Sequence, residues 1–397
     1  MNRKTDIRTY LTYTLSLGCF WACYSVTSGF AAPYLQNRGF TSSQLGIIMA
    51  IAYLLSLLLS LYLSARTDTA GESSSLDYLL GLLGMQLAAI ALLFIDNVYI
   101  VALAYVLMGG SVFAGTALYV KLFVTLSKFT SMDGYGKSRA AGSLCYALTS
   151  FACGFILKSA PSYLLLLLNA FFALVQIIAL ISIRKNGVVP TGKASRENAD
   201  RARRAADNRA ELLPFLRRNP GFPMLLLGAG LIFMVHNSIS TFTINMVEHL
   251  GGDVVDMGNI NGFSIFIEIP FMTLYSRIDK KHCRHILMLS FAVFVFKICI
   301  TAAAWSIPVL FVAFALRAVA FALYTPAVVD YISSRIPYED SGKAQGLAAN
   351  VPLLGTMVGS VLFGVMFDHC GVPVTLLAFC AAVILGAIAA FIGIRKR

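Results

Sequence analysis

Four residues that can ionise lie inside long apolar stretches in the second half of the sequence: His236, Glu268, Lys297 and Arg317. A charge near the middle of a bilayer is costly unless it faces a cavity or a partner. A carboxylate that can exchange its proton, next to a cation and a histidine, has the chemistry of a proton relay. We therefore predict a proton-coupling site in which Glu268 exchanges the proton and His236 relays it. A salt-bridge network that only locks the helices together is the alternative.

The composition indicates that these residues belong to an integral membrane protein. Of 397 residues, 58% are hydrophobic and 13% are charged, and the mean hydropathy is +0.76. Soluble domains are nearer half apolar and a quarter charged, so a soluble enzyme, a disordered chain and a fibrous protein are excluded. We expect an all-α protein with twelve helices, each able to cross about 30 Å of hydrocarbon. They are predicted at residues 9–31, 43–65, 77–95, 98–120, 137–159, 161–183, 222–246, 257–276, 285–304, 307–333, 343–367 and 372–394.

A long polar stretch divides the predicted helices into two sets of six. We predict an N-terminal bundle over residues 1–185, a cytoplasmic linker over 186–220 and a C-terminal bundle over 221–397. Two equal sets joined by a linker are typical of internally duplicated secondary carriers. Within the linker, residues 195–213 are rich in Ala, Arg and Glu and predict a surface helix, with a solvated tether as the alternative.

The net charge of +12 follows the predicted topology. Most of the 31 Lys and Arg residues fall in segments that are cytoplasmic when both termini are cytoplasmic, as the positive-inside rule requires. No basic stretch is interleaved with aromatic residues, so we expect no nucleic-acid partner. The expected setting is a bacterial inner membrane, crossed many times, with the protein acting as a monomer.

The sequence contains no motif for catalysis or for a cofactor. It has no Gly-x-x-x-x-Gly-Lys-Ser/Thr phosphate-binding loop, which argues against an ATP-driven pump. The run His282-Cys283-Arg284-His285 matches no zinc-ligand spacing. We expect no enzyme activity, no cofactor and no metal site.

Four stretches share their pattern with one group of carriers. They are residues 36–46 between the first two spans, the Tyr-Gly-x-x-Arg-x-x-Gly-Ser pattern at 135–143, Glu268-Ile269-Pro270, and Ala344-Gln345-Gly346 followed by Gly355, Gly359, Gly364, Asp368 and Gly371. With them the chain resembles the major facilitator superfamily, in the branch that contains lactose permease and the nucleoside–proton symporters. The resemblance implies two pseudo-symmetric six-helix halves that rock to give alternating access. It also implies proton-coupled symport of a sugar, a glycoside or a nucleoside, bound between the halves.

The resemblance also implies a set of substrate-binding residues. Arg139 would donate hydrogen bonds to the solute, and Tyr146 stands where galactoside carriers have a stacking tryptophan. The further residues that we expect at the solute are Trp21, Tyr24, Lys121 and Asn237. Lys121 stands where those carriers have a glutamate that pairs with the arginine. Two facing cations repel, so either the solute is anionic or Lys121 points away.

The resemblance further implies gating groups in the short loops between spans. The superfamily's Gly-x-x-x-Asp-Arg signature is reduced to Arg66 and Asp68 in one loop and to Arg277, Asp279 and Lys280 in another. Two alternatives to sugar or nucleoside symport stay open. One is an organic-anion carrier of the same fold, favoured by the surplus of buried cations, and the other is a receptor or scaffold that does not transport.

Overall fold

The computed structural model describes residues 3–69, 73–130, 135–188, 212–275 and 277–395, and every regular element in these ranges is a helix. The helices are α1 (Arg3–Tyr24), a π-helical turn (Ser25–Gly29), α2 (Ala31–Gln36), α3 (Ser42–Thr69), α4 (Ser74–Leu92), α5 (Val98–Phe129), α6 (Tyr135–Ser159), α7 (Tyr163–Lys185), α9 (Leu212–Arg218), α10 (Gly221–Thr241), α11 (Thr243–His249), α12 (Val254–Tyr275), a 3₁₀ turn (Lys280–His282), α13 (Cys283–Ala302), α14 (Ile307–Arg335) and α15 (Tyr338–Arg395).

These helices supply the twelve predicted spans. Nine of the described helices are long and apolar enough to cross a membrane. The last of them, α15, holds two spans, because Gly371 interrupts its helical course at φ +73° and ψ 174°. Two further spans are α1, continued by the π turn and α2, and α12, which contains Pro270. The all-α class with twelve spans is thus confirmed.

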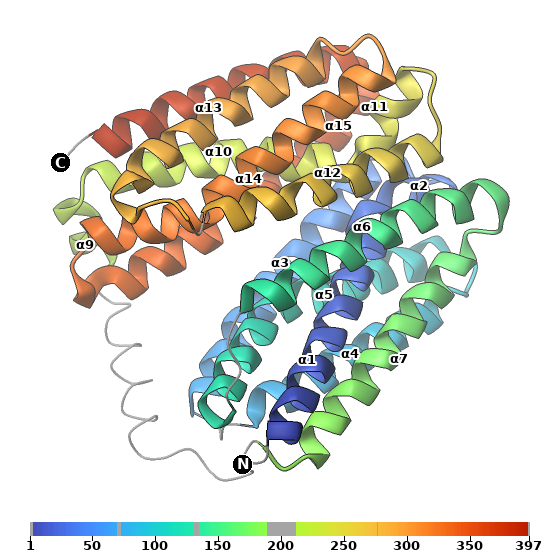
Figure 1. The fold of residues 1–397 in the computed structure, drawn as a ribbon. Coiled ribbons are helices and arrows are strands. Elements are labelled where there is room, and N and C mark those ends of the chain that lie inside the picture. The colour runs from blue at the N-terminus through green and yellow to red at the C-terminus, as the bar shows by residue number, and fades with distance from the viewer. Residues whose placement is uncertain (1–2, 70–72, 131–134, 189–211, 276, 396–397) are drawn as a thin grey trace. The chain divides into compact units, whose positions relative to one another are not determined.

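The chain forms two compact units. Unit 1 contains residues 1–30 and 51–207, and unit 2 contains residues 31–50 and 208–397. In unit 1, α1 packs on α6 and α7, and α4 packs on α5 and α7 (Figure 1). In unit 2, α10 and α13 pack on α15, and α12 and α13 pack on α14. The predicted boundaries at 185 and 221 stay a prediction, and the predicted surface helix over 195–213 lies outside the described residues except for its last two.

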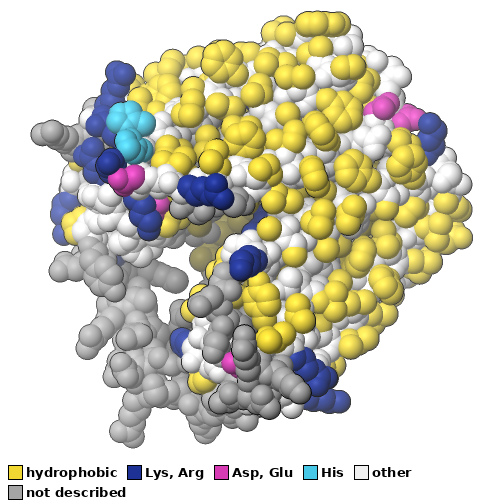
Figure 2. Space-filling model, in the orientation of Figure 1, with side chains coloured by type: hydrophobic (Ala, Val, Ile, Leu, Met, Phe, Trp, Pro, Cys, Tyr) yellow, Lys and Arg dark blue, Asp and Glu magenta, His cyan; other side chains and the backbone are white. Residues whose placement is uncertain are grey.

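The outward-facing side chains of both units are largely apolar. Ile178 is 68% exposed and Phe296 is 65% exposed, and many other large hydrophobic residues behave likewise. Figure 2 shows hydrophobic side chains over most of the visible face, while Lys and Arg gather at its margins. Apolar patches of this extent need an apolar medium. The chain is therefore a multi-pass membrane protein.

A carboxylate on α15 caps the amino end of α3. Asp368 accepts hydrogen bonds from the Ser42 N–H at 3.1 Å and from the Ser43 N–H at 2.7 Å, and the Ser43 hydroxyl donates to it at 2.6 Å. The first N–H groups of a helix have no partner inside the helix and form the positive end of its dipole. Gly46 and Gly364 bring the two helices together, since a Cβ on either would lie 2.2 Å from a carbonyl oxygen of the other helix. These contacts explain why residues 31–50 group with the C-terminal helices.

Replacing Asp368 with Ala is expected to lower the free energy of unfolding by about 1–2 kcal/mol, because two helix N–H groups lose their acceptor. Asp368→Asn keeps one acceptor oxygen, so its free energy of unfolding should lie between those of the parent and of Asp368→Ala. Thermal unfolding in detergent measures the loss, and hydrogen exchange of the Ser42 and Ser43 amides locates it.

Asp77→Ala is the matched control for the cap variants. Asp77 pairs with Arg184 at 2.9 Å, but their side chains are 45% and 51% exposed, and exposed pairs contribute about 0–1 kcal/mol. Unchanged protection of the two serine amides in Asp368→Ala would show that the carboxylate does not hold the end of α3.

Candidate functional site

One group of the predicted substrate-binding residues lies between α1 and α6 in unit 1. The Arg139 guanidinium carbon lies 3.9 Å from the ring centroid of Trp21, and Nη1 donates a hydrogen bond to the Ser143 hydroxyl at 2.6 Å. Positions three or four residues apart share one face of a helix, so 139, 142, 143 and 146 form a continuous face of α6. The stack and the hydrogen bond fix the plane of the guanidinium and so present its remaining N–H donors in a defined direction.

Gly142 makes this stack possible. A Cβ at Gly142 would lie 2.5 Å from Cδ1 of Trp21, so any side chain there would push the indole away. The Trp21 ring also packs against Tyr24 with 5.2 Å between centroids, and the Tyr146 hydroxyl would lie 3.3 Å from a Cβ on Gly29. The structure thus places Trp21, Tyr24, Arg139 and Tyr146 at one interface between α1, the π turn and α6.

The indole nitrogen of Trp21 points to a use for this interface. Nε1 of Trp21 is buried, and no described residue accepts a hydrogen bond from it. Buried donors are nearly always paired, and those that are not call for an explanation such as a ligand. An aromatic face, an unused indole N–H and a fixed guanidinium together form a surface that recognises hydroxyl or carbonyl oxygens beside a flat ring.

The first span changes from α-helix to π-helix over Ser25–Gly29. A π turn displaces carbonyl groups from the regular ladder. The Thr27 carbonyl oxygen accepts a hydrogen bond from the Tyr105 hydroxyl at 2.8 Å. The Thr27 hydroxyl accepts one from the Asn169 side chain at 2.9 Å. Gln86 in turn donates to the Asn169 side chain at 2.6 Å. Sequence reasoning missed this buried network, although amides within apolar runs were a usable signal, because they need partners there.

Lys121 is directed to a different element. Its ammonium donates a hydrogen bond to the Thr67 hydroxyl on α3. This geometry favours the second of the two possibilities left by the sequence, in which Lys121 points away from Arg139. The neighbouring gating candidate Arg66 lies over the Tyr62 ring at 5.4 Å, and Asp68 belongs to α3 but its side chain lies outside what the structure describes.

The four predicted proton-coupling residues are all buried in unit 2. Their exposed fractions are 5% for His236 on α10, 3% for Glu268 on α12, 1% for Lys297 on α13 and 8% for Arg317 on α14. The helices of Glu268 and Lys297 both pack on α14, which carries Arg317. Arg317 donates to the Ser240 hydroxyl at 3.1 Å, and that hydroxyl donates to the His236 carbonyl at 3.1 Å. Arg317 therefore reaches α10 one turn beyond His236.

The His236 ring lies among aromatic side chains. It stacks on Phe321 at 5.7 Å with 3° between the planes, and it meets Phe294 and Phe233 edge-on at 5.0 and 5.5 Å. Its Nδ1 is buried and has no hydrogen-bond partner among the described residues. The ring thus lies in an aromatic pocket, with one ring nitrogen that no described side chain occupies.

The burial of Lys297 has a high cost in free energy. Its Nζ is buried and forms no hydrogen bond with any described residue. Nζ lies 5.7 Å from the ring centroid of Phe314, and the Arg317 guanidinium carbon lies 5.6 Å from the same centroid. A buried ammonium without a paired anion costs several kcal/mol. This part of unit 2 is therefore suited to an added negative charge.

The predicted residues Asn237, Asp279 and Lys280 fall outside this cluster. Asn237 donates to the Thr356 hydroxyl at 2.7 Å and ties α10 to α15. The backbone N–H and the ammonium of Lys281 hold the pKa of Asp279 below its usual range, with the ammonium 2.9 Å from the carboxylate. Lys280 pairs instead with Asp330 at 3.6 Å.

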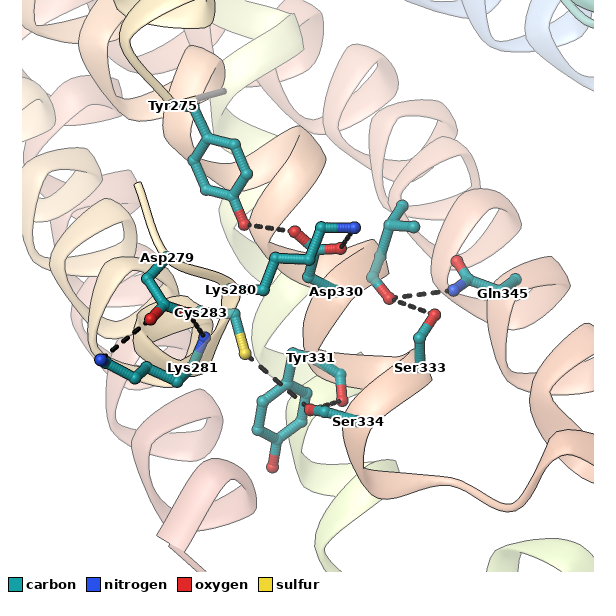
Figure 3. A network of polar contacts seen from close by, with 11 residues as sticks. Tyr275, Asp279, Lys280, Lys281, Cys283, Asp330, Tyr331, Ser333, Ser334 and Gln345 are labelled. Carbon is teal, nitrogen blue, oxygen red and sulfur yellow. Dashed lines mark hydrogen bonds and ion pairs between the residues drawn. The ribbon is translucent and has the colours of Figure 1, made fainter. Parts of the chain in front are cut away.

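Asp330 joins three elements at one end of unit 2 (Figure 3). It accepts a hydrogen bond from the Tyr275 hydroxyl at 2.8 Å, in addition to its ion pair with Lys280. Nearby, Gln345 of α15 donates to the Val329 carbonyl at 3.2 Å. The structure makes Asp330 the residue that connects α12, the following loop and α14.

Residues 10–392 match the model of the MFS_1 like family. The chain belongs to this family. The resemblance to the major facilitator superfamily is thereby confirmed for nearly the whole sequence. No curated protein sequence matches this MFS_1-like chain.

Several solved structures share the fold of this MFS_1-like protein. The nucleoside transporter NupG has a TM-score of 0.76 at 12% identity, over 100% of both chains. A D-xylose-proton symporter has a TM-score of 0.68 at 15% identity, over 98% of this chain and 97% of the other. The human organic anion transporter MFSD10 (TETRAN) has a TM-score of 0.64 at 13% identity, over 98% and 100%. At such low identity these likenesses establish the fold alone.

Gly142→Ala is expected to displace Trp21 from Arg139, because the new methyl group would overlap the indole. The sequence has two Trp residues, so Trp305→Phe leaves Trp21 as the single tryptophan. We expect a shifted emission maximum and stronger acrylamide quenching, with loss of a cation–π contact of about 0.5–2 kcal/mol.

Gly136→Ala on the same helix is the control for this prediction, because a Cβ there meets nothing within 4 Å. Its Trp21 emission should match that of the parent. Identical spectra for Gly142→Ala and the parent would refute the stacked arrangement.

Proposed function

We propose that the protein is a proton-coupled symporter of a small polar solute, such as a sugar, a glycoside or a nucleoside, and that it works by alternating access. The observation that carries this proposal is Glu268, a carboxylate only 3% exposed on a helix that packs against the helix of Arg317. A buried acid near a cation can hold or release a proton according to whether the cation stays close. Membership of the MFS_1 like family supports the class of protein, a carrier and not an enzyme.

In this proposal the solute is recognised by the interface of α1 and α6. Arg139 supplies N–H donors in a fixed plane, and Trp21 and Tyr146 supply an aromatic face and further hydrogen-bonding groups. Hydroxyl-rich rings and nucleosides combine oxygen acceptors with a flat or apolar face, which this interface matches. The nucleoside transporter and the D-xylose-proton symporter among the structures of the same fold are consistent with these solute classes.

The gating groups belong to the same proposal. Asp330, Tyr275 and Lys280 form contacts at one end of unit 2 that can open and close without disturbing a helix. Arg66 and Asp68 would serve unit 1, with Asp279 supporting the loop that carries Lys280. We propose that these ends face the cytoplasm of a bacterium, together with both termini, and that the protein works in the inner membrane as a monomer.

Glu268→Gln is expected to abolish accumulation of the solute against its gradient, because the side chain keeps its size but loses its exchangeable proton. A thermal-stability screen with uridine, D-xylose and lactose first identifies a solute that binds. Uptake by liposomes with an imposed pH gradient then measures coupling. Solute exchange without a gradient should persist in the variant.

Glu248→Gln provides the control for coupling, because Glu248 lies at the exposed end of α11. It should accumulate the solute as the parent does. Gradient-driven accumulation in Glu268→Gln would contradict the assignment of the proton to Glu268. Absence of solute-dependent proton flux in the parent protein would favour the receptor or scaffold alternative.

A second candidate function is transport of small organic anions. The specific observation in its favour is the Lys297 ammonium, which is buried beside Phe314 together with Arg317 and has no described hydrogen-bond partner. A carboxylate on the solute would supply the missing negative charge. The human organic anion transporter of the same fold is consistent with this chemistry.

Lys297→Gln separates the two candidates. For a neutral solute, we expect KM to stay within about twofold and the melting temperature to rise, because an unpaired buried charge is removed. For an anion such as glucuronate, KM should rise at least about tenfold, because a charge-assisted hydrogen bond contributes about 1.5–3 kcal/mol.

Lys343→Gln is the matched control for Lys297→Gln, since Lys343 is also largely buried but pairs with Asp340 at 3.4 Å. It should not raise the melting temperature. A lower melting temperature for Lys297→Gln, with no change in KM for either kind of solute, would contradict two statements about Lys297. One is that it is an unpaired buried charge, and the other is that it binds an anionic solute.

A further inference from the structure

Unit 2 contains a pocket of about 490 Å³ where α10 begins and where α14 and α15 end. It is separate from the buried cluster around Lys297 and from the Asp330 network. Its lining combines arginine side chains with buried apolar ones, and neither proton coupling nor solute recognition uses it.

The floor of the pocket is apolar and rigid. Phe222 and Leu225 of α10 and Tyr331 and Ile336 from the end of α14 line it, and all four are buried. One close approach between helices sets its shape. A Cβ on Gly393 would lie 2.5 Å from the Gly221 carbonyl oxygen, so α15 and α10 touch at their backbones here. The walls of the pocket are therefore fixed by backbone contact.

The short helix α9 is anchored beside this floor. Phe215 of α9 is fully buried, and its ring meets the Phe222 ring edge-on at 5.5 Å. The Asn219 side chain donates back to the Phe215 carbonyl at 3.1 Å. These contacts hold the last turn of α9 at the pocket and so place Arg218 on its rim.

The rim carries positive charge. Arg218 and Arg335 both line the pocket and are both exposed, and the Arg335 guanidinium lies 6.0 Å over the Tyr331 ring. Arg218 pairs with Asp340 at 3.5 Å, but the same carboxylate also pairs with Lys343 at 3.4 Å. The rim thus carries two guanidinium groups, those of Arg218 and Arg335.

We propose that this pocket binds the headgroup of an anionic phospholipid. The phosphate would lie between Arg218 and Arg335, whose planar guanidinium groups suit phosphate oxygens, and the glycerol and first methylenes would cover Phe222, Leu225 and Ile336. Basic pockets between helices at a membrane surface bind anionic headgroups in this way. A free phosphate ion would use the rim and leave the apolar floor uncovered, so the two-part lining favours a lipid. The lipid would brace α9 and α10 against α14 and α15.

Lipid binding to the purified full chain tests this proposal. Delipidated protein in detergent is titrated with phosphatidylglycerol or phosphatidylcholine, and native mass spectrometry reads the bound lipid. We expect phosphatidylglycerol to bind preferentially. Arg218→Gln with Arg335→Gln should weaken its binding about twenty-fivefold, from about fivefold for each arginine. Arg335→Gln alone changes one exposed side chain and should weaken it about fivefold.

The control is Arg277→Gln with Lys281→Gln, which removes two positive charges from exposed positions outside the pocket lining. Its affinity for phosphatidylglycerol should stay within about twofold of the parent. Parent-like binding by both arginine variants would overturn the proposal. So would displacement of the bound lipid by millimolar inorganic phosphate, which would identify a soluble anion as the ligand.

Discussion

The fold depends on the absence of hydrogen-bond partners in hydrocarbon. Backbone groups are satisfied within helices, and polar side chains must find each other across helix interfaces. Ser25 pairs with Ser150, Gln86 with Asn169 and Asn237 with Thr356, each across a contact between helices. Each such pair fixes one helix against another, because separating them would leave two unsatisfied groups in an apolar medium. The same constraint gives meaning to polar atoms that have no partner within the described residues. Trp21 Nε1, His236 Nδ1 and Lys297 Nζ are of this kind, and all three belong to residues with a predicted functional role.

The two units solve the problem of a buried cation differently. In unit 1, Arg139 rests on Trp21 and bonds to Ser143, so the charge is stabilised while N–H donors stay available. In unit 2, Lys297 and Arg317 lie around one Phe314 ring, and Arg317 donates a hydrogen bond to Ser240, whereas the Lys297 nitrogen has no partner among the described residues. The first arrangement suits recognition of neutral oxygens, because the cation is already stabilised. The second suits a site whose net charge changes, either when Glu268 takes up a proton or when a charged solute binds, as in the proposed function.

The spans could be predicted from the sequence because hydropathy and length alone define them. Contacts between distant residues could not. Tyr275, Lys280 and Asp330 come together only because α12 and α14 pack, and no spacing in the sequence indicates that Lys280 takes Asp330 as its partner. The π turn was also hidden, since its residues, Ser25–Gly29, lie within one predicted span. Asp368 was noticed as part of a family pattern, but its role as the cap of α3 appears only when Ser42 and Ser43 lie beside it. Arg139 and Trp21 were both expected at the solute, whereas Gly142, which permits their stacking, was part of a motif whose purpose the sequence did not reveal.

The helix α3 connects these observations. Its first residues, up to 50, pack within unit 2, and its remainder packs within unit 1, although the helix is continuous from Ser42 to Thr69. In alternating access the two halves of a carrier change their contacts. A continuous helix that packs on both halves cannot keep all of those contacts in every state. The close backbone contacts at Gly46 and Gly364 involve no charged group. The Asp368 cap is different, because three hydrogen bonds end on one carboxylate and are lost together when it withdraws. The amino end of α3 is therefore attached within unit 2 by one carboxylate as well as by backbone packing.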